Sequence, residues 1–160
     1  MQQSNELEII KFDIKGHNYE VRYFPAIYNT NLFIKFTSYI GSSFSKFLGV
    51  LNGINLEKLR EGNFEGDFGA LGEGINKIFS SIYVNDPEGK IILEVMSHTT
   101  RDGVAINKET FNKFYTGNIE EMTHAFIKTL HVHFAPFLPI KQLSGLLTEK
   151  DLESIPNTAN

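Results

Sequence analysis

The chain contains 160 residues with a hydrophobic share of 41% and a formal net charge of −4, a composition typical of a globular protein that buries a core. Its 15 basic residues are scattered along the sequence, so we do not expect the basic face that binds nucleic acid. Cysteine is absent, which excludes disulfides and thiolate zinc sites, and every apolar run is far shorter than the roughly 20 residues of a membrane span.

The N-terminal third predicts a β-hairpin followed by two helices. Apolar and polar residues alternate on both sides of a Lys-Gly-His-Asn break, which indicates two strands within residues 8–24. Pro25 suits the first turn of a helix over 26–40, and a second helix is expected over 43–51. The buried line predicted for the first helix is Tyr28, Leu32, Phe36 and Tyr39.

The middle of the chain alternates between glycine-rich and helical segments. Residues 52–66 have the composition of a loop, and helical spacing then runs from Asp67 to Tyr83. A further helix over 87–98 is apolar on nearly all sides, which predicts that it lies at the centre of the fold. After a turn at Asp102, residues 104–106 suit a short strand, and a helix capped by Asn107 should end at Gly117.

A longer helix is predicted over 118–135. Asn118 with Glu121 three residues later matches a capping box, and Pro136 ends the helix because it lacks a backbone donor. The apolar positions fall on one arc, which contains Ile119, Met122, Phe126, Ile127, Leu130 and Phe134. We expect exposed side chains at Glu120, His124, Lys128 and His131, and a partly buried one at His133.

These elements predict an α+β fold that is mainly helical, with an N-terminal β-hairpin packed on five or six helices. We expect a single domain over residues 1–155 and a disordered tail over 156–160.

No group of residues predicts catalysis or a cofactor. The histidines of the 118–135 helix lack the i,i+4 spacing of a complete metal site, and the glycines of 66–74 do not follow a strand as a phosphate-binding loop requires. The serines of 41–45 lack the glycine pattern of a nucleophile elbow. We therefore expect no catalytic residue, no metal and no cofactor.

Two stretches carry a family resemblance. The motif Phe111-x-x-x-Tyr115-x-Gly117, followed by Leu130-x-Val132-x-Phe134-x-x-Phe137-Leu138, resembles the C-terminal signature of bacteriophage tail assembly chaperones. His131 and His133 depart from it, since an acid and an asparagine are usual there. Residues 12–24 resemble the opening hairpin of the same family, and the likeness spans residues 9–138. The motif positions are Phe111, Tyr115, Gly117, Phe126, Leu130, Phe134 and Phe137.

The resemblance implies a non-catalytic chaperone that binds the phage tape-measure protein in the host cytoplasm and keeps it soluble while the tail tube assembles. It also implies that the chain forms homo-oligomers and associates with a longer, frameshifted form of itself. Two alternatives stay open at this point. One is a structural tail protein retained in the virion, and the other is a small enzyme or a metal-dependent regulator that uses the histidine helix.

The aromatic content points to a contact surface. The chain has 14 Phe and 6 Tyr, more than the helical lines of a small domain can bury at once, and surplus aromatic surface marks partner sites. We expect partner binding or self-association through four residues of the 26–51 region, namely Phe33, Phe36, Phe44 and Phe47.

Overall fold

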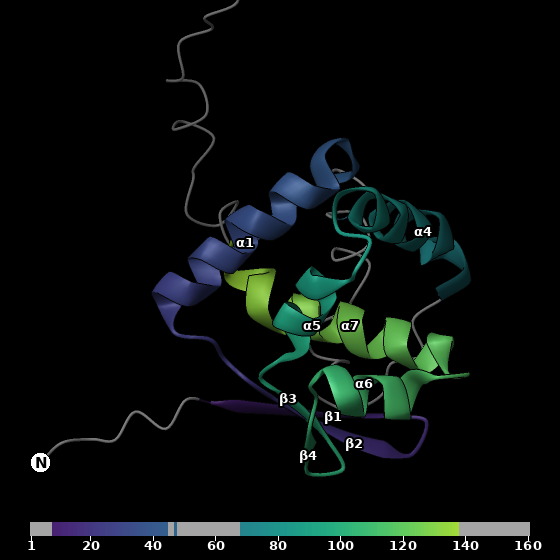
Figure 1. The fold of residues 1–160 in the computed structure, drawn as a ribbon. Helices are drawn as coiled ribbons and strands as arrows, with labels where there is room; N and C mark the ends of the chain where they lie inside the picture. Colours follow the sequence, from purple (N-terminus) through teal and green to yellow (C-terminus); the bar gives the residue numbers. More distant parts are fainter. Residues whose placement is uncertain (1–7, 45–46, 48–67, 138–160) are drawn as a thin grey trace, which may run out of the picture.

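The structure is a computed structural model that describes residues 8–44, 47 and 68–137 (Figure 1). Within them, four strands form one antiparallel sheet and five α-helices complete the fold, so the predicted α+β, mainly helical class is confirmed. The strands are β1 (Ile9–Ile14), β2 (His17–Arg22), β3 (Thr99–Arg101) and β4 (Val104–Ala105). The helices are α1 (Ala26–Ile40), α4 (Phe68–Asn85), α5 (Lys90–Met96), α6 (Lys108–Tyr115) and α7 (Ile119–Phe134).

The predicted hairpin forms as expected and becomes half of the sheet. Ile14 pairs with His17 across a two-residue turn in which Lys15 and Gly16 have φ values of 52° and 80°, the left-handed conformation that closes tight hairpins. The chain returns much later to add β3 beside β2 and β4 beside β3. The short strand expected over 104–106 forms as β4, but β3 was not predicted, because its residues Thr-Thr-Arg are all polar and show no alternation.

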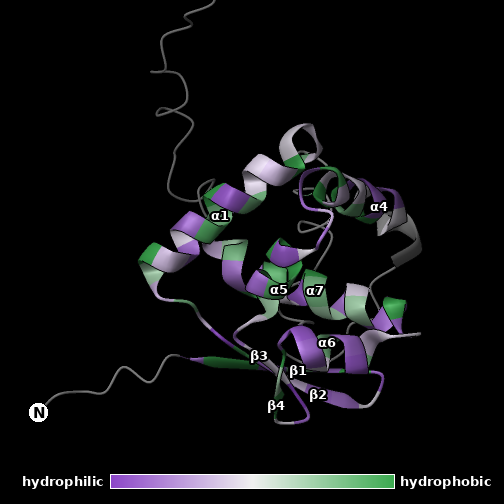
Figure 2. Ribbon diagram, in the orientation of Figure 1, coloured by the Kyte–Doolittle hydropathy of each residue, from purple (hydrophilic) through white to green (hydrophobic). Residues whose placement is uncertain are grey.

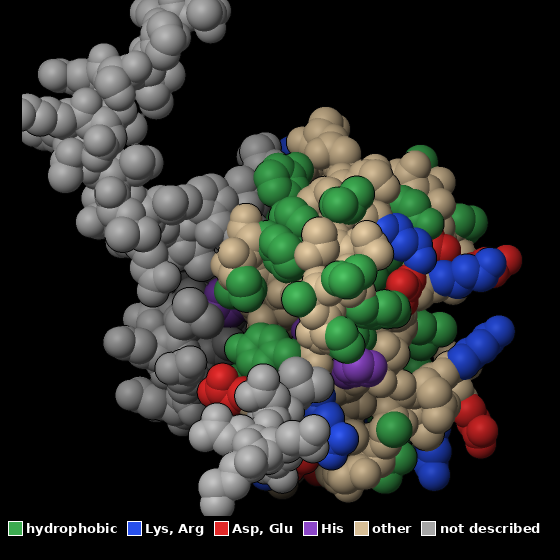
Figure 3. Space-filling view, turned by 90° about the vertical axis from the view of Figure 1, so that its left-hand side faces the viewer, with side chains coloured by type: hydrophobic (Ala, Val, Ile, Leu, Met, Phe, Trp, Pro, Cys, Tyr) green, Lys and Arg blue, Asp and Glu red, His purple; other side chains and the backbone are tan. Residues whose placement is uncertain are grey.

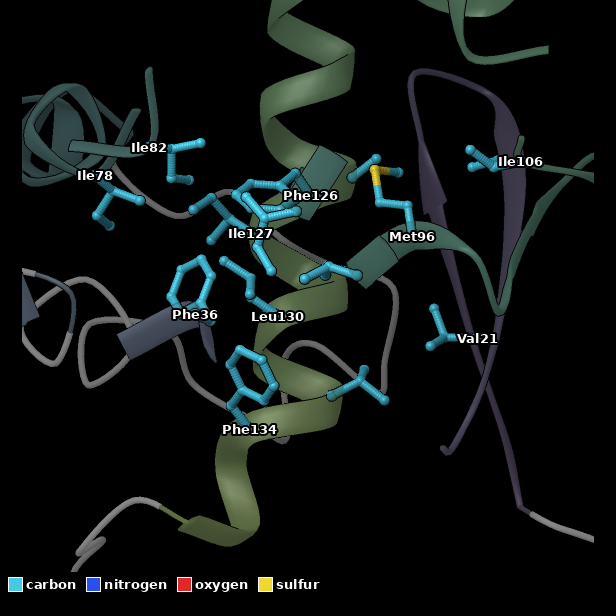
Figure 4. Close-up of a cluster of buried hydrophobic side chains, with 14 of the residues drawn as sticks. Val21, Phe36, Ile78, Ile82, Met96, Ile106, Phe126, Ile127, Leu130 and Phe134 are labelled. Atoms are coloured by element: carbon cyan, nitrogen blue, oxygen red, sulfur yellow. The ribbon is translucent and has the colours of Figure 1, made fainter. Parts of the chain in front are cut away.

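Helix α7 is the centre of the fold. It lies between the sheet on one side and α1 and α4 on the other, with α5 and α6 alongside (Figure 1). Phe126, Leu130 and Phe134 are fully buried as predicted, and Figure 4 shows them pointing into one cluster with residues of α1, α4 and α5. The helix expected over 87–98 forms as the shorter α5, and the expectation that it is buried holds on one side only: Ile91, Val95 and Met96 are fully buried, whereas Ile92 and Leu93 are partly exposed.

Because neighbours surround most of α7, several of its polar residues are buried too. Lys128 and His131 are each only 2% exposed, so the expectation that they face solvent is wrong. Lys128 Nζ lies 3.4 Å from the Asp13 carbonyl oxygen and 5.1 Å from the centre of the Phe12 ring, and burial lowers its pKa to about 8. Glu120 is exposed as predicted, and His124 is half-buried.

The two helix starts near the C-terminus differ. Asn107 caps α6 through a capping box, since its side chain accepts from Thr110 N and the Thr110 hydroxyl accepts from Asn107 N. The capping box predicted for α7 is wrong: Asn118 Nδ2 donates to the Phe114 carbonyl 3.2 Å away. The Glu121 side chain does not cap the helix, because it is buried and bonded to Arg101. Helix α6 is mostly hydrophilic (Figure 2), as expected for a helix with one side in solvent.

Several predictions fall on residues outside the described part of the chain. They are most of the 43–51 helix, the 52–66 loop and the 156–160 tail.

Candidate protein-binding surfaces

The four aromatic residues predicted to bind a partner do not form an exposed surface. Phe36 and Phe47 are fully buried and their rings lie 5.1 Å apart, so the expectation of exposed aromatic surface is wrong for both. Phe33 and Phe44 are partly buried against the core. The Phe33 ring stacks on Phe137 at 4.7 Å. Both phenylalanines of α1 therefore point toward α7, and their role in partner binding stays a prediction. The expectation that Tyr28 is buried is wrong, because it is 41% exposed and donates to Glu94.

Most motif positions maintain the fold. Phe126, Leu130, Phe134 and Tyr115 are buried, and Phe137 packs against the core. Gly117 has a φ of 81°, which lets the chain turn from α6 into α7. Phe111 differs from them because it lines a surface groove.

A buried polar cluster joins the sheet to both C-terminal helices. Glu121 accepts hydrogen bonds from Arg101 Nε at 2.7 Å and from the Tyr19 hydroxyl at 2.6 Å. The Tyr115 hydroxyl lies 3.1 Å from that of Tyr19, and the Arg101 guanidinium lies 4.7 Å from the centre of the Phe114 ring. The sequence could not indicate this cluster, because its members come from β2, β3, α6 and α7.

The protonation states of this cluster fit a structural role. Burial alone would raise the pKa of Glu121, but hydrogen bonds from Arg101 and Tyr19 hold it below its ordinary value. Burial raises the pKa of Tyr115 to about 12, so its phenol stays protonated. A carboxylate that is paired with a guanidinium and shielded from solvent is poorly placed to exchange protons with a substrate. The cluster therefore links elements of the fold.

His131 and His133, which depart from the family motif, are buried and uncharged. Burial lowers the pKa of His131 to about 4 and that of His133 to about 3. The His133 ring lies 4.1 Å from that of Phe24, and its backbone carbonyl accepts from Asn29 Nδ2 at 2.7 Å. No three His, Asp or Glu side chains within 8–44, 47 and 68–137 are grouped to hold a metal ion.

The outer face of α1 carries exposed apolar residues. Ile27 is 80% exposed and Ile34 is 59% exposed, while Asn31 and Ser38 between and beyond them are exposed as well. Figure 3 views the molecule from the side on which α1 begins and shows apolar side chains gathered over this face, with charged ones toward its margins. The spacing of 4, 3 and 4 residues was readable in the sequence, but the stronger Phe and Leu pattern on the opposite side masked it.

A depression of about 310 Å³ lies where the ends of α1 and α4 meet. Asn85 Nδ2 joins the two helices by donating to the Tyr39 carbonyl at 2.8 Å. On α4, Val84 at the rim is 78% exposed and the adjacent Tyr83 is 71% exposed. The depression is lined by uncharged residues throughout, namely Ser38, Tyr39, Ile40, Gly41, Ser42, Ser80, Ser81, Val84 and Asn85.

A narrower groove of about 140 Å³ lies between α5 and α6. Its apolar lining comes from Ile92, Leu93 and Phe111, all partly exposed. Glu88 and Lys108 also line it, so charges of both signs are available to a bound segment. The groove has room for an apolar side chain of a partner.

Comparison with known proteins identifies the family. The family model described as "Phage tail assembly chaperone protein, TAC" matches residues 15–147. The chain belongs to the phage tail assembly chaperone family. No curated protein and no solved structure matches it. Membership supports a role in phage tail assembly and implies a non-enzymatic one. Within the described parts of this family member, no helix has the length and apolar character needed to cross a membrane.

Proposed function

We propose that this chain is a non-catalytic tail assembly chaperone that binds the tape-measure protein in the host cytoplasm. Binding would keep the apolar helical segments of that partner soluble until the tail tube forms around it. The family match over residues 15–147 supports this role, and the surface of the protein offers a place for such a segment.

The observation that carries the proposal is the position of Phe111. This motif residue lines the groove between α5 and α6, where it lies with Ile92 and Leu93. Amphipathic helices bind such grooves by inserting apolar side chains at intervals of three or four residues. We propose that a tape-measure helix inserts one apolar residue between Leu93 and Phe111, with Glu88 and Lys108 contacting its polar flanks.

Co-expression with the tape-measure protein of the same phage tests this proposal. The wild-type chain should raise the soluble fraction of the tape-measure protein and co-purify with it. Leu93→Glu places a charge in the groove and should abolish both effects, because a bound apolar side chain would then face a carboxylate. Ile119→Glu is the matched control, since Ile119 is 64% exposed and lies outside the groove.

Two results would contradict the proposal. One is full co-purification by a folded Leu93→Glu variant, which would show that the groove is not used. The other is recovery of this chain from purified virions at the level of a tail protein, because a chaperone should leave before the particle is complete.

A further inference from the structure

Helix α1 has two stripes, and only one of them faces the core. Its buried line is Asn29, Leu32, Phe36 and Ile40. At 100° per residue, a second stripe falls on the opposite side of the helix within an arc of roughly 60°. This outer stripe consists of Ile27, Asn31, Ile34 and Ser38.

Among the residues that the structure describes, the outer stripe and the lining of the neighbouring depression contain no charged side chain. Lys35 is the single charged residue of α1, and it lies to the side of the stripe in an ion pair with Glu94 of α5. Ser38 belongs both to the stripe and to the lining of the depression, so the two are continuous. In a chain with 19 acidic and 15 basic residues, such a surface lets two copies meet without opposing like charges.

A protrusion and a hollow lie at opposite ends of this surface. Ile27 is 80% exposed near the start of α1, and the depression beside Ser38 lies near its end. Eleven residues separate them, which is about 16 Å along the helix. A two-fold axis perpendicular to α1 would pass midway between Asn31 and Ile34. It would bring Ile27 of each copy to the depression beside Ser38 of the other copy.

We infer that two copies of this chain pair through antiparallel α1 helices, each inserting Ile27 into the depression of its partner. The interface is isologous, because one surface supplies both the protrusion and the hollow. The two Ile34 side chains meet near the axis, and the exposed Tyr83 and Val84 extend the contact at each end. A parallel pair would place Ile27 against Ile27 and leave both depressions empty. This pairing is independent of the tape-measure protein and leaves the α5–α6 groove open.

Sedimentation velocity on the purified full chain over a range of concentrations tests the pairing. The wild-type chain should show a monomer–dimer equilibrium. Ile27→Asp should lower the association constant by about tenfold or more, since it buries an unpaired charge. Ile119→Asp is the control and should dimerise as the wild type does, because Ile119 is equally accessible but lies on α7. A wild-type chain that stays monomeric, or an Ile27→Asp variant that dimerises normally, would overturn the inference.

Cross-linking determines the direction of the helices, and the absence of cysteine makes single labels possible. Ile27→Cys and Ser38→Cys variants are mixed and treated with a bifunctional thiol reagent much shorter than the expected separation of identical sites, about 16 Å. The mixture should give a cross-linked dimer containing one copy of each variant, and each variant alone should give none. Efficient cross-linking of Ile27→Cys alone would indicate parallel helices and contradict the inference.

Discussion

The burial of His131 and His133 predicts a steep loss of stability in mild acid. In the folded chain, burial lowers the pKa of His131 to about 4 and that of His133 to about 3, whereas an unfolded histidine titrates near 6.5. Between these values the unfolded chain binds more protons than the folded one, so the free energy of unfolding falls as the pH falls. The loss begins near pH 6.5 and continues until the folded histidines protonate.

The size of the effect follows from the unfolded pKa. At pH 5, protonation stabilises each unfolded histidine by about 2 kcal/mol, while the folded histidines remain almost uncharged. The two sites together should lower the free energy of unfolding by about 4 kcal/mol between pH 7.5 and pH 5. This is a large part of the roughly 5–15 kcal/mol that stabilises a typical domain. The sequence had indicated a shallow dependence, because it placed His131 on an exposed turn.

Urea unfolding followed by circular dichroism at several pH values measures this dependence. The control is a His131→Gln, His133→Phe double variant, which removes both titrating rings. Its unfolding free energy should vary much less between pH 7.5 and pH 5, whatever its absolute stability, because the comparison uses slopes. A wild-type curve that is flat over this range, or an equally steep curve for the double variant, would refute the assignment of buried neutral histidines.

Three further substitutions test the packing. Phe126→Ala should lower the free energy of unfolding by about 3–5 kcal/mol in urea titrations, because Phe126 is fully buried. Arg101→Met should cost about 3–5 kcal/mol by leaving Glu121 buried without its cation, and the loss should shrink when Glu121→Gln is added. Phe33→Asp should destabilise the fold in thermal melts, since it places a charge in the stack with Phe137, whereas Ile119→Asp at the exposed start of α7 should leave the melting temperature nearly unchanged.

The position of the exposed apolar surface illustrates a limit of sequence patterns. The sequence pointed to α1 as a contact element, but through its aromatic residues, and the structure turns Phe36 into the core while exposing Ile27 and Ile34. A helical pattern specifies which residues share a face. It does not specify which face the rest of the chain covers, and the larger aromatic side chains gain more from burial.

Local features were determined by the sequence itself. The Lys15-Gly16 turn, the Asn107 cap and the end of α7 near Pro136 each depend on neighbouring residues, whose conformational preferences act without distant partners. The apolar spacing of α7 likewise predicted that Phe126 would be buried. Family membership was also readable from the sequence, because the motif residues lie close together along the chain.

Only the tertiary structure decided which polar residues are buried. Lys128 and His131 lie on the polar side of α7, yet they are covered because the sheet and the other helices enclose this helix. Glu121 caps no helix, since Arg101, twenty residues earlier, reaches its carboxylate from β3. Burial and ion pairing depend on what the folded chain brings alongside a residue, and a single periodic pattern holds no information about neighbours distant in sequence.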